Sequence, residues 1–120
     1  RMLQGVIEVM RSNDTAKAAL IRKMDDDVDR LYAAIKTYLT QISRESLDER
    51  EGRRWAEIIS LTINLEHVGD IVDKNLMELA EKKARKQWSF SEAGMAEIEH
   101  LHGRVVANLQ LGLNIFVNPD

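Results

Sequence analysis

Apolar residues recur every three or four positions along nearly the whole 120-residue chain, which is the period of an amphipathic α-helix. No segment alternates with period two, and the single proline, Pro119, stands almost at the end of the chain. Hydrophobic residues make up 44% and charged residues 31% of the chain, a mixture that suits long amphipathic helices. We therefore expect an all-α fold, an antiparallel helical bundle with one modest core, in a single domain over residues 1–120.

Residues that favour helix ends divide this pattern into four helices. Ser12-Asn13-Asp14 should end a first helix that lacks a cap at its own start, and should begin a second helix. Ser46 with Glu49 has the spacing of a capping box, and so has Ser89 with Glu92, and each pair predicts the start of a further helix. We expect helices over about residues 2–10, 15–45, 48–86 and 90–116, the last of them ending at Asn118-Pro119-Asp120.

The long helices carry apolar stripes that predict their buried faces. A short loop joins the second and third helices, so they should form an antiparallel hairpin that turns between Ser46 and Asp48. The seam of the second helix is expected at Leu20, Met24, Val28, Leu31, Ile35, Tyr38 and Ile42. The stripe of the third helix is expected at Trp55, Ile58, Leu61, Leu65, Val68, Val72, Leu76 and Leu79. The inner face of the fourth helix is expected at Met95, Ile98, Val105, Leu109 and Phe116.

A row of acidic residues follows the stripe of the third helix. Glu66, Asp70 and Asp73 recur at spacings of four and three, so they lie along one side of the helix. Like charges at these spacings repel and weaken an isolated helix, which suggests that a cation binds there. Gly69 stands among them at a cost of about 1 kcal/mol relative to alanine. We expect this glycine to allow close approach of a neighbouring helix or a ligand to the backbone.

The second helix carries a matching acidic pair, Asp25 and Asp29. Counting back from the turn places Asp29 level with Leu65 and Asp25 level with Gly69, because the rise per residue is equal in both helices. Asp25 and Asp29 should therefore meet Glu66 and Asp70 on one outer edge of the hairpin. We expect a surface site there and not a buried one. Clustered carboxylates suit hard or borderline cations such as Mg, Mn, Ca, Fe, Ni or Zn. The alternative is an acidic face that is simply solvated.

Other classes of function find little support in the sequence. A net charge of −3 argues against a general nucleic-acid binder, and no cysteine is present for disulfides or thiolate metal sites. Glu99-x-x-His102 has the spacing used in di-iron bundles, but such sites need a second copy and two further inward acids. No phosphate loop or catalytic set is recognisable, so we expect no enzyme.

Two features bear on the surroundings of the chain. The cations Lys82, Lys83, Arg85 and Lys86 suit the negative end of the third helix, with a lipid or partner contact as the alternative. No apolar run approaches the ~20 residues of a membrane span. The chain starts at Arg1 within a helical pattern, so we expect it to be a fragment of a longer protein.

The segment Leu65-Glu66-His67-Val68-Gly69-Asp70 resembles the PhoU family, regulators of bacterial phosphate uptake. The family is built from three-helix repeats with E/D-x-x-x-D motifs, which here read Glu66-x-x-x-Asp70 and Asp25-x-x-x-Asp29. The resemblance implies that these acids, with Asp73 beside them, bind divalent or trivalent metal ions, often as multinuclear clusters. The longer run from Ile63 to Leu79 is most similar to the PhoU-like cytoplasmic domain of bacterial sodium/phosphate cotransporters, as is the tail from Asn108 to Phe116.

The resemblance implies a non-enzymatic regulatory domain at the cytoplasmic side of the cell membrane, with the transmembrane part of a parent transporter as a partner. The family usually has two three-helix repeats, whereas this chain has about one repeat and a partial extra helix. Apolar surface meant for missing helices would stay uncovered, so we expect a homodimer or a higher symmetric oligomer. The rival interpretation is a structural helical module that dimerises and binds no metal.

Overall fold

The computed structural model describes residues 1–43 and 45–118, and within them it contains helices and loops but no strand. The helical segments are α1 (Met2–Ser12), α2 (Thr15–Ser43), α3 (Glu49–Asp70), the π-helical η1 (Ile71–Leu76), α4 (Met77–Arg85) and α5 (Glu92–Val117). The segments α3, η1 and α4 run on without a break as one long helix. The expected all-α bundle is therefore confirmed, in an elongated molecule of 57 × 28 × 15 Å.

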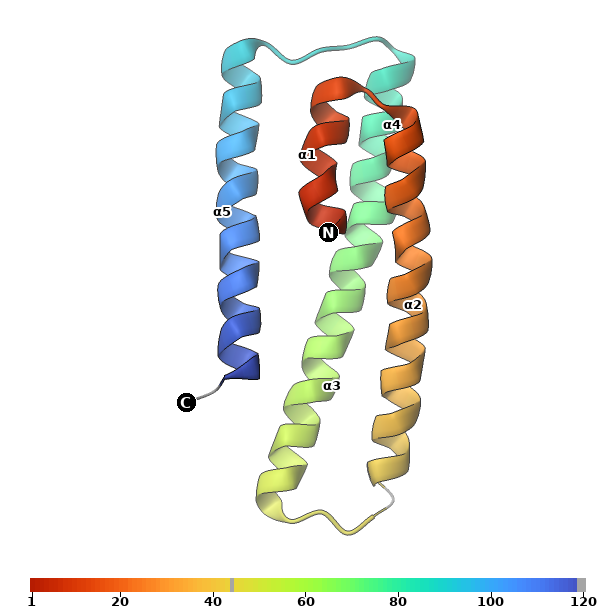
Figure 1. Ribbon diagram of the computed structural model, residues 1–120, viewed down its shortest axis with the longest axis vertical. Coiled ribbons are helices and arrows are strands. Elements are labelled where there is room, and N and C mark those ends of the chain that lie inside the picture. The colour runs from red at the N-terminus through yellow and green to blue at the C-terminus, as the bar shows by residue number, and fades with distance from the viewer. Residues whose placement is uncertain (44, 119–120) are drawn as a thin grey trace.

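The long hairpin of α2 against α3–η1–α4 is the frame of the molecule (Figure 1). The short helix α1 covers only the half of this hairpin that contains α4, and α5 runs along the far side of α1. The core lies where α1, α2, η1 and α4 meet, and its fully or nearly buried members are Met2, Val6, Val9, Ala18, Ile21, Val72, Met77 and Ala80. No described helix is both long enough and apolar enough to cross a membrane.

The hairpin turns where the sequence predicts, since α2 ends at Ser43 and α3 begins at Glu49. The predicted capping box is wrong by two residues. Asp48 is the N-cap: its Oδ1 accepts the backbone N–H of Glu51 at 2.8 Å, and Glu51 Oε2 accepts the N–H of Asp48 at 3.3 Å. Aspartate caps a helix as well as serine does, and this pair satisfies two otherwise free N–H groups at the observed helix start.

The start of α5 is also two residues later than predicted. Ser91, not Ser89, is its N-cap, and Ser91 Oγ accepts the backbone N–H of Gly94 at 3.0 Å. The residues before it remain in a loop, where the carbonyl of Trp88 accepts a hydrogen bond from the Asn13 side chain at 3.3 Å. At its other end α5 stops at Val117 with Asn118 as its cap. The predicted stop includes Pro119 and Asp120, which lie outside the described residues.

The predicted seam of α2 is rotated from the observed one. Leu20, Leu31 and Tyr38 are 62%, 62% and 63% exposed. The buried residues of α2 are Ala18, Ile21, Asp25 and Leu39. The first three follow a three-and-four spacing, but one of them is a carboxylate and another is a small alanine. An apolar stripe drawn through the large hydrophobic residues therefore misses the true seam.

The stripe of the third helix changes phase at η1. The backbone N–H of Met77 donates to the carbonyl of Val72, five residues back, so this turn holds one residue more than an α-turn. Val72 is buried as predicted, but the predicted Leu79 is exposed and Met77 and Ala80 are buried in its place. The extra residue in the π-turn explains this correction.

Helix α5 packs beside α1 and contributes no buried residue. An ion pair between Arg11 and Glu99 holds the two helices together. His102 Nε2 also lies 2.6 Å from the carbonyl oxygen of Leu3. At the other end of α5, the guanidinium of Arg54 on α3 donates to the carbonyl of Phe116 at 3.0 Å. Within one chain, α5 thus lies alongside the bundle and leaves much of its own surface exposed.

Candidate metal centre

Helix α2 lies close against α3 at Gly69. A Cβ at this position would stand 3.0 Å from Asp25 Oδ1 and 3.3 Å from Val28 Cγ1. Both distances are shorter than ordinary van der Waals contact, so a larger residue here would displace the side chains of Asp25 and Val28. The predicted register, with Asp25 level with Gly69, is confirmed, and so is the expected role of the glycine.

Three of the predicted site residues come together beside this contact. Asp25, Asp29 and Asp70 each offer one carboxylate oxygen, and these oxygens lie within 4.8 Å of one another. Asp25 is only 5% exposed, Asp70 is half-buried and Asp29 is exposed. The expectation of a pure surface site is therefore wrong for Asp25, because its position belongs to the buried seam of α2. The cluster spans the interface from the core edge to the solvent.

The buried member of this triad is electrostatically unsatisfied. Asp25 Oδ1 is buried and has no hydrogen-bond partner among the described residues, a state that is costly for a carboxylate. The pKa of Asp25 is raised from 3.8 to about 6, chiefly by burial and then by the negative charges of Asp29, Asp73 and Asp70. The charge of Lys74 acts in the opposite direction. The protein therefore concentrates negative potential at a buried oxygen that lacks a donor.

The other two predicted ligands stand around the triad. A hydrogen bond with Asp70 is the largest cause that raises the pKa of Glu66, followed by burial and by the charge of Asp70. Glu66 is not among the three residues whose carboxylate oxygens lie within 4.8 Å of one another. Asp73 is half-buried in η1 and acts on Asp25 through its charge. Lys74 Nζ lies 3.6 Å from Asp70 Oδ1 and supplies a partial countercharge.

The π-helical turn is a feature of the site that sequence analysis missed. Segment η1 begins directly after Asp70 and contains Asp73, so it changes the angle between these two acids relative to an α-helix. Such π-turns occur frequently at functional sites. The sequence Ile71–Leu76 has no signal for it, since the same residues suit an α-helix equally well.

The histidines do not contribute to this cluster. His67 is exposed, as predicted. Glu99 pairs with Arg11, and His102 lies against the carbonyl of Leu3, so both residues of the Glu99-x-x-His102 spacing hold α5 onto α1. The carboxylate triad has oxygen ligands only, which favours hard cations over those that prefer imidazole or thiolate.

Residues 1–79 match the PhoU domain family, and the chain belongs to this family. The matched region contains all five acids that sequence analysis assigned to the site. The chain is 39% identical over its whole length to the "Putative inorganic phosphate export protein YjbB" of Salmonella typhimurium, and 38% identical to the protein of the same name from Escherichia coli K12. It spans 22% of the length of each relative. No solved structure matches the chain.

Proposed function

We propose that this chain is a metal-binding, non-enzymatic regulatory domain that adjusts phosphate transport by a larger membrane protein similar to sodium/phosphate cotransporters. Membership of the PhoU family and two relatives named as phosphate export proteins support the link to phosphate transport. In this proposal the domain stands on the cytoplasmic side of the membrane and contacts the transmembrane part of the parent protein.

The observation that carries the proposal is the buried, unpartnered Oδ1 of Asp25 beside two further carboxylates. A cation between Asp25, Asp29 and Asp70 gives that oxygen a partner and removes the repulsion within the triad. Glu66 and Asp73 complete the ligand set, Glu66 through its contact with Asp70 and Asp73 from the π-turn. A divalent or trivalent ion fits this set, with Mg, Mn or Fe ahead of Ni or Zn because every ligand is oxygen.

Thermal unfolding with and without metal tests the binding site. Protein stripped by a chelator should gain melting temperature when a suitable metal is added, since a ligand that binds only the folded state stabilises it by mass action. Asp70→Asn should reduce that gain and leave the metal-free protein equally stable or slightly more so. Asp26→Asn is the matched control, because it removes the same charge from an exposed neighbour outside the triad. Calorimetry that detects no binding to the wild type would disprove the metal site.

Elemental analysis of the purified protein then gives the metal and its stoichiometry per chain. The regulatory role is tested separately, in cells that carry the full-length parent protein. Phosphate flux should change when Asp25 and Asp70 are both replaced by Asn and should stay at the wild-type level with Asp26→Asn. Unchanged flux in a double variant that no longer binds metal would refute regulation by the metal.

A purely structural role is the second candidate function, and one observation favours it. Helix α5 has no buried residue, and it carries the exposed residues Leu101, Val105, Leu111 and Ile115. At about 100° per residue, Leu101, Leu111 and Ile115 fall on one face, distinct from the face that meets α1. Val105, which was expected on the inner face, is 46% exposed and lies at the edge between the two faces. We propose that this second apolar face of α5 packs against another copy of the chain. Self-association without any metal binding would favour the structural role over the regulatory one.

A further inference from the structure

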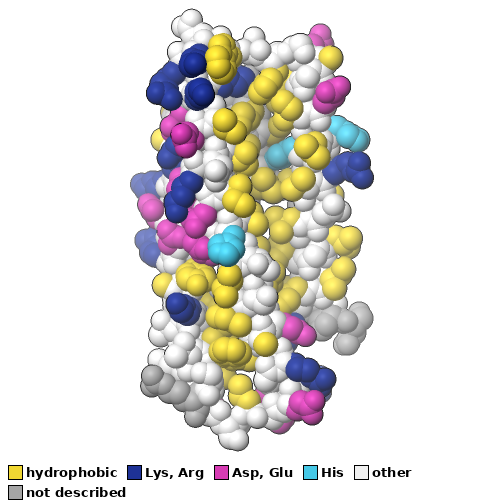
Figure 2. Space-filling model, turned by 180° about the vertical axis from the view of Figure 1, so that it is seen from behind, with side chains coloured by type: hydrophobic (Ala, Val, Ile, Leu, Met, Phe, Trp, Pro, Cys, Tyr) yellow, Lys and Arg dark blue, Asp and Glu magenta, His cyan; other side chains and the backbone are white. Residues whose placement is uncertain are grey.

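The end of the molecule where α4 stops carries a cluster of cations beside exposed aromatic rings. Lys82, Lys83, Arg85 and Lys86 fall within five residues, and no acidic residue occurs between Glu81 and Glu92. Figure 2 shows Lys and Arg side chains gathered at this end next to apolar surface. The loop that follows exposes Trp88 by 54% and Phe90 by 44%. We call this surface the basic–aromatic end.

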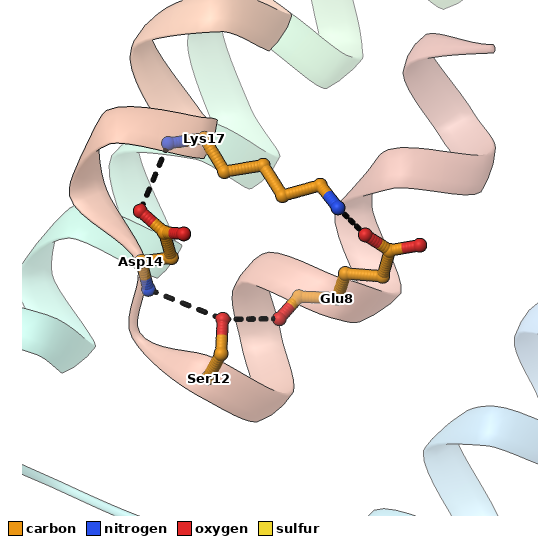
Figure 3. A network of polar contacts seen from close by, with 4 residues as sticks. All are labelled: Glu8, Ser12, Asp14 and Lys17. Atoms are coloured by element: carbon orange, nitrogen blue, oxygen red, sulfur yellow. Dashed lines mark hydrogen bonds and ion pairs between the residues drawn. The ribbon is translucent and has the colours of Figure 1, made fainter.

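Most neighbouring cations are neutralised by a carboxylate, but those of the basic–aromatic end are not. Lys17 pairs with Glu8 in a network that also fixes Ser12 and Asp14 at the turn between α1 and α2 (Figure 3). Arg22 pairs with Glu81 at 2.9 Å, and Arg11 pairs with Glu99. Across the described residues, no carboxylate forms an ion pair with Lys82, Arg85 or Lys86, all of which are exposed.

The nearest acids along the chain and at the adjoining helix starts already have other roles: Glu81 pairs with Arg22, and Asp14 and Glu92 stand at the starts of α2 and α5. Asp14 Oδ1 accepts the backbone N–H of Lys17 at 3.1 Å, and Glu92 lies in the first turn of α5. Lys83 is buried and donates to Asn13 Oδ1, so the exposed positive charge of this end comes from Lys82, Arg85 and Lys86. A chain of net charge −3 thus concentrates positive charge on one end of its long axis.

The loop that presents the aromatic rings is held in place by backbone hydrogen bonds. Gln87 adopts a left-handed conformation with φ 55°, and the N–H of Trp88 donates to the carbonyl of Lys83 at 3.0 Å. The N–H of Gln87 also donates to the carbonyl of Ala84 at 3.1 Å. These two hydrogen bonds form a Schellman motif at the end of α4. Asn13 fixes the same loop from the α1–α2 turn: its Nδ2 donates to the Trp88 carbonyl, and its Oδ1 accepts from Lys83 Nζ at 2.6 Å. The backbone that carries Trp88 is therefore fixed by hydrogen bonds from both its N–H and its carbonyl group.

A solvated helix end explains the cations, because they suit the negative end of the helix dipole. It does not explain why Trp88, Phe90 and Leu79 are exposed at the same end and border a groove of about 420 Å³. Lys86 lies 4.7 Å from the centre of the Trp88 ring, but a cation on one face leaves the rest of that ring in water. Aromatic rings beside lysine and arginine are typical of surfaces that meet the interfacial region of a bilayer.

We propose that the basic–aromatic end docks onto the surface of an anionic lipid membrane. Trp88, Phe90 and Leu79 enter the headgroup region, while Lys82, Arg85 and Lys86 lie against the phosphates of anionic lipids. The positive charge of the basic–aromatic end is complementary to an anionic membrane surface. Because this end lies at one tip of the long axis of the molecule, the rest of the domain can point away from the membrane. This contact is independent of the metal centre, which lies between α2 and α3.

Co-sedimentation of the chain with vesicles tests the proposal. We expect binding to vesicles of phosphatidylcholine mixed with phosphatidylglycerol and little binding to phosphatidylcholine alone. The binding should weaken from ~0.1 M to ~1 M salt, as the screening length falls from about 10 to about 3 Å. Emission of Trp88 should shift to the blue on binding, and the Trp88→Phe variant should lose that shift, since the remaining Trp55 lies at the other end of the hairpin. Equal binding to both kinds of vesicle, or none to either, would overturn the proposal.

Charge-matched variants locate the surface. Each basic residue near an anionic membrane strengthens binding about fivefold, so replacing Lys82, Arg85 and Lys86 by Gln should weaken binding roughly 100-fold. The control replaces Lys23, Arg50 and Arg53 by Gln, which removes the same charge from exposed positions elsewhere. Both triple variants should keep the wild-type melting temperature, because these side chains are exposed. Similar losses in the two variants would mean that total charge, and not this surface, determines binding.

The same experiments distinguish a membrane from two other partners of the basic–aromatic end, free phosphate and a second copy of the chain. If inorganic phosphate displaces the chain from vesicles far better than chloride at equal ionic strength, the cations form a site for free phosphate. If the Lys82, Arg85 and Lys86 variant changes the mass measured by light scattering but binds vesicles like the wild type, the surface joins two copies of the chain. Either result would overturn docking on a membrane.

Discussion

The carboxylate of Asp25 lies against the backbone of Gly69, with Oδ1 3.0 Å from the position that a Cβ at residue 69 would take. This contact brings an acidic residue into the seam between two packed helices, where its pKa rises to about 6. The glycine that weakens α3 locally is the residue that lets the two helices approach and gather the acids. Fold and candidate site therefore depend on the same contact.

Gly69→Ala should lower metal affinity at least tenfold and should not stabilise the protein. Alanine gains about 1 kcal/mol in helix propensity, but its methyl group would force Asp25 and Val28 away from α3. Titration calorimetry and thermal unfolding measure the two effects. Gly103→Ala is the matched control, since a Cβ there meets nothing within 4 Å and the melting temperature should rise by about 4 °C. Unchanged metal affinity in Gly69→Ala would show that the close contact does not shape the site.

The pairing of the acids was predictable from the sequence, but their burial was not. Counting residues back from the turn was enough to place Asp25 opposite Gly69, because both helices rise equally per residue. The apolar pattern predicts a seam of α2 that includes Leu20, Leu31 and Tyr38, because large apolar residues normally mark the buried face. Here Asp25 occupies a seam position, so a charged residue interrupts the apolar pattern of the buried face. A buried carboxylate is an exception that apolar periodicity cannot reveal.

The π-turn was likewise outside the reach of sequence patterns. The predicted stripe fits Leu65, Val68 and Val72, and it fails at Leu79, one turn after η1. Either helix type leaves hydrophobic residues on the inner face after Val72, since Leu76 and Met77 are adjacent and both apolar. The π-turn places Met77 and Ala80 in the core together with Met2, Val6 and Val9 of α1. The helix boundaries, which depend on local capping residues, were predicted to within two residues.

Metal-free protein should lose stability as the pH rises from about 4 to about 6. The pKa of Asp25 is higher in the folded protein, at about 6, than its ordinary value of 3.8. Between these values the folded state binds more protons than the unfolded state, so the free energy of unfolding falls as the pH rises. The difference should be on the order of 1–3 kcal/mol once Asp25 is ionised in both states, because water screens part of the interaction. Denaturant unfolding in the presence of a chelator measures this dependence.

Asp25→Asn should remove most of that pH dependence. The neutral side chain cannot ionise, and its amide can donate hydrogen bonds to the neighbouring carboxylates, so the metal-free variant should exceed the wild type in stability at pH 7. The exposed Asp26→Asn should keep the wild-type dependence. A wild-type curve that stays flat between pH 4 and 6 would contradict an elevated pKa of Asp25. Added metal should reverse the trend in the wild type, because it stabilises the ionised carboxylate.

Deletion of Asn75 should convert η1 into an ordinary α-helical turn. This exposed residue lies within the π-turn, and its loss removes the one extra residue while the flanking turns keep their places on α1 and α2. Stability should therefore change by less than about 1 kcal/mol. Metal affinity should fall, because Asp73 would turn away from Asp70 and Asp25. Deletion of the exposed Lys74 would also remove a charge at the site, which makes Asn75 the cleaner choice.

A deletion variant that unfolds would not decide this question, so Asp73→Asn provides a second measurement. It leaves the π-turn intact and removes one charge that acts on Asp25. If the π-turn serves to aim Asp73 at the metal, Asp73→Asn and the deletion should lower metal affinity to a similar extent. An effect of the deletion alone would mean that the π-turn serves the packing of Met77 and not the site.

The chain should form a homodimer through the outward face of α5. Leu101 and Ile115 are exposed on this face, and burying each against a second copy should contribute about 1.5–3 kcal/mol. Light scattering across a dilution series should show a dimer that dissociates at low concentration. Replacing both residues by Gln should weaken the dimer at least 100-fold. Leu20→Gln with Leu31→Gln is the matched control, since these leucines are equally exposed on α2. A monomeric mass that persists at high wild-type concentration would mean that α5 serves only to cover its own α1.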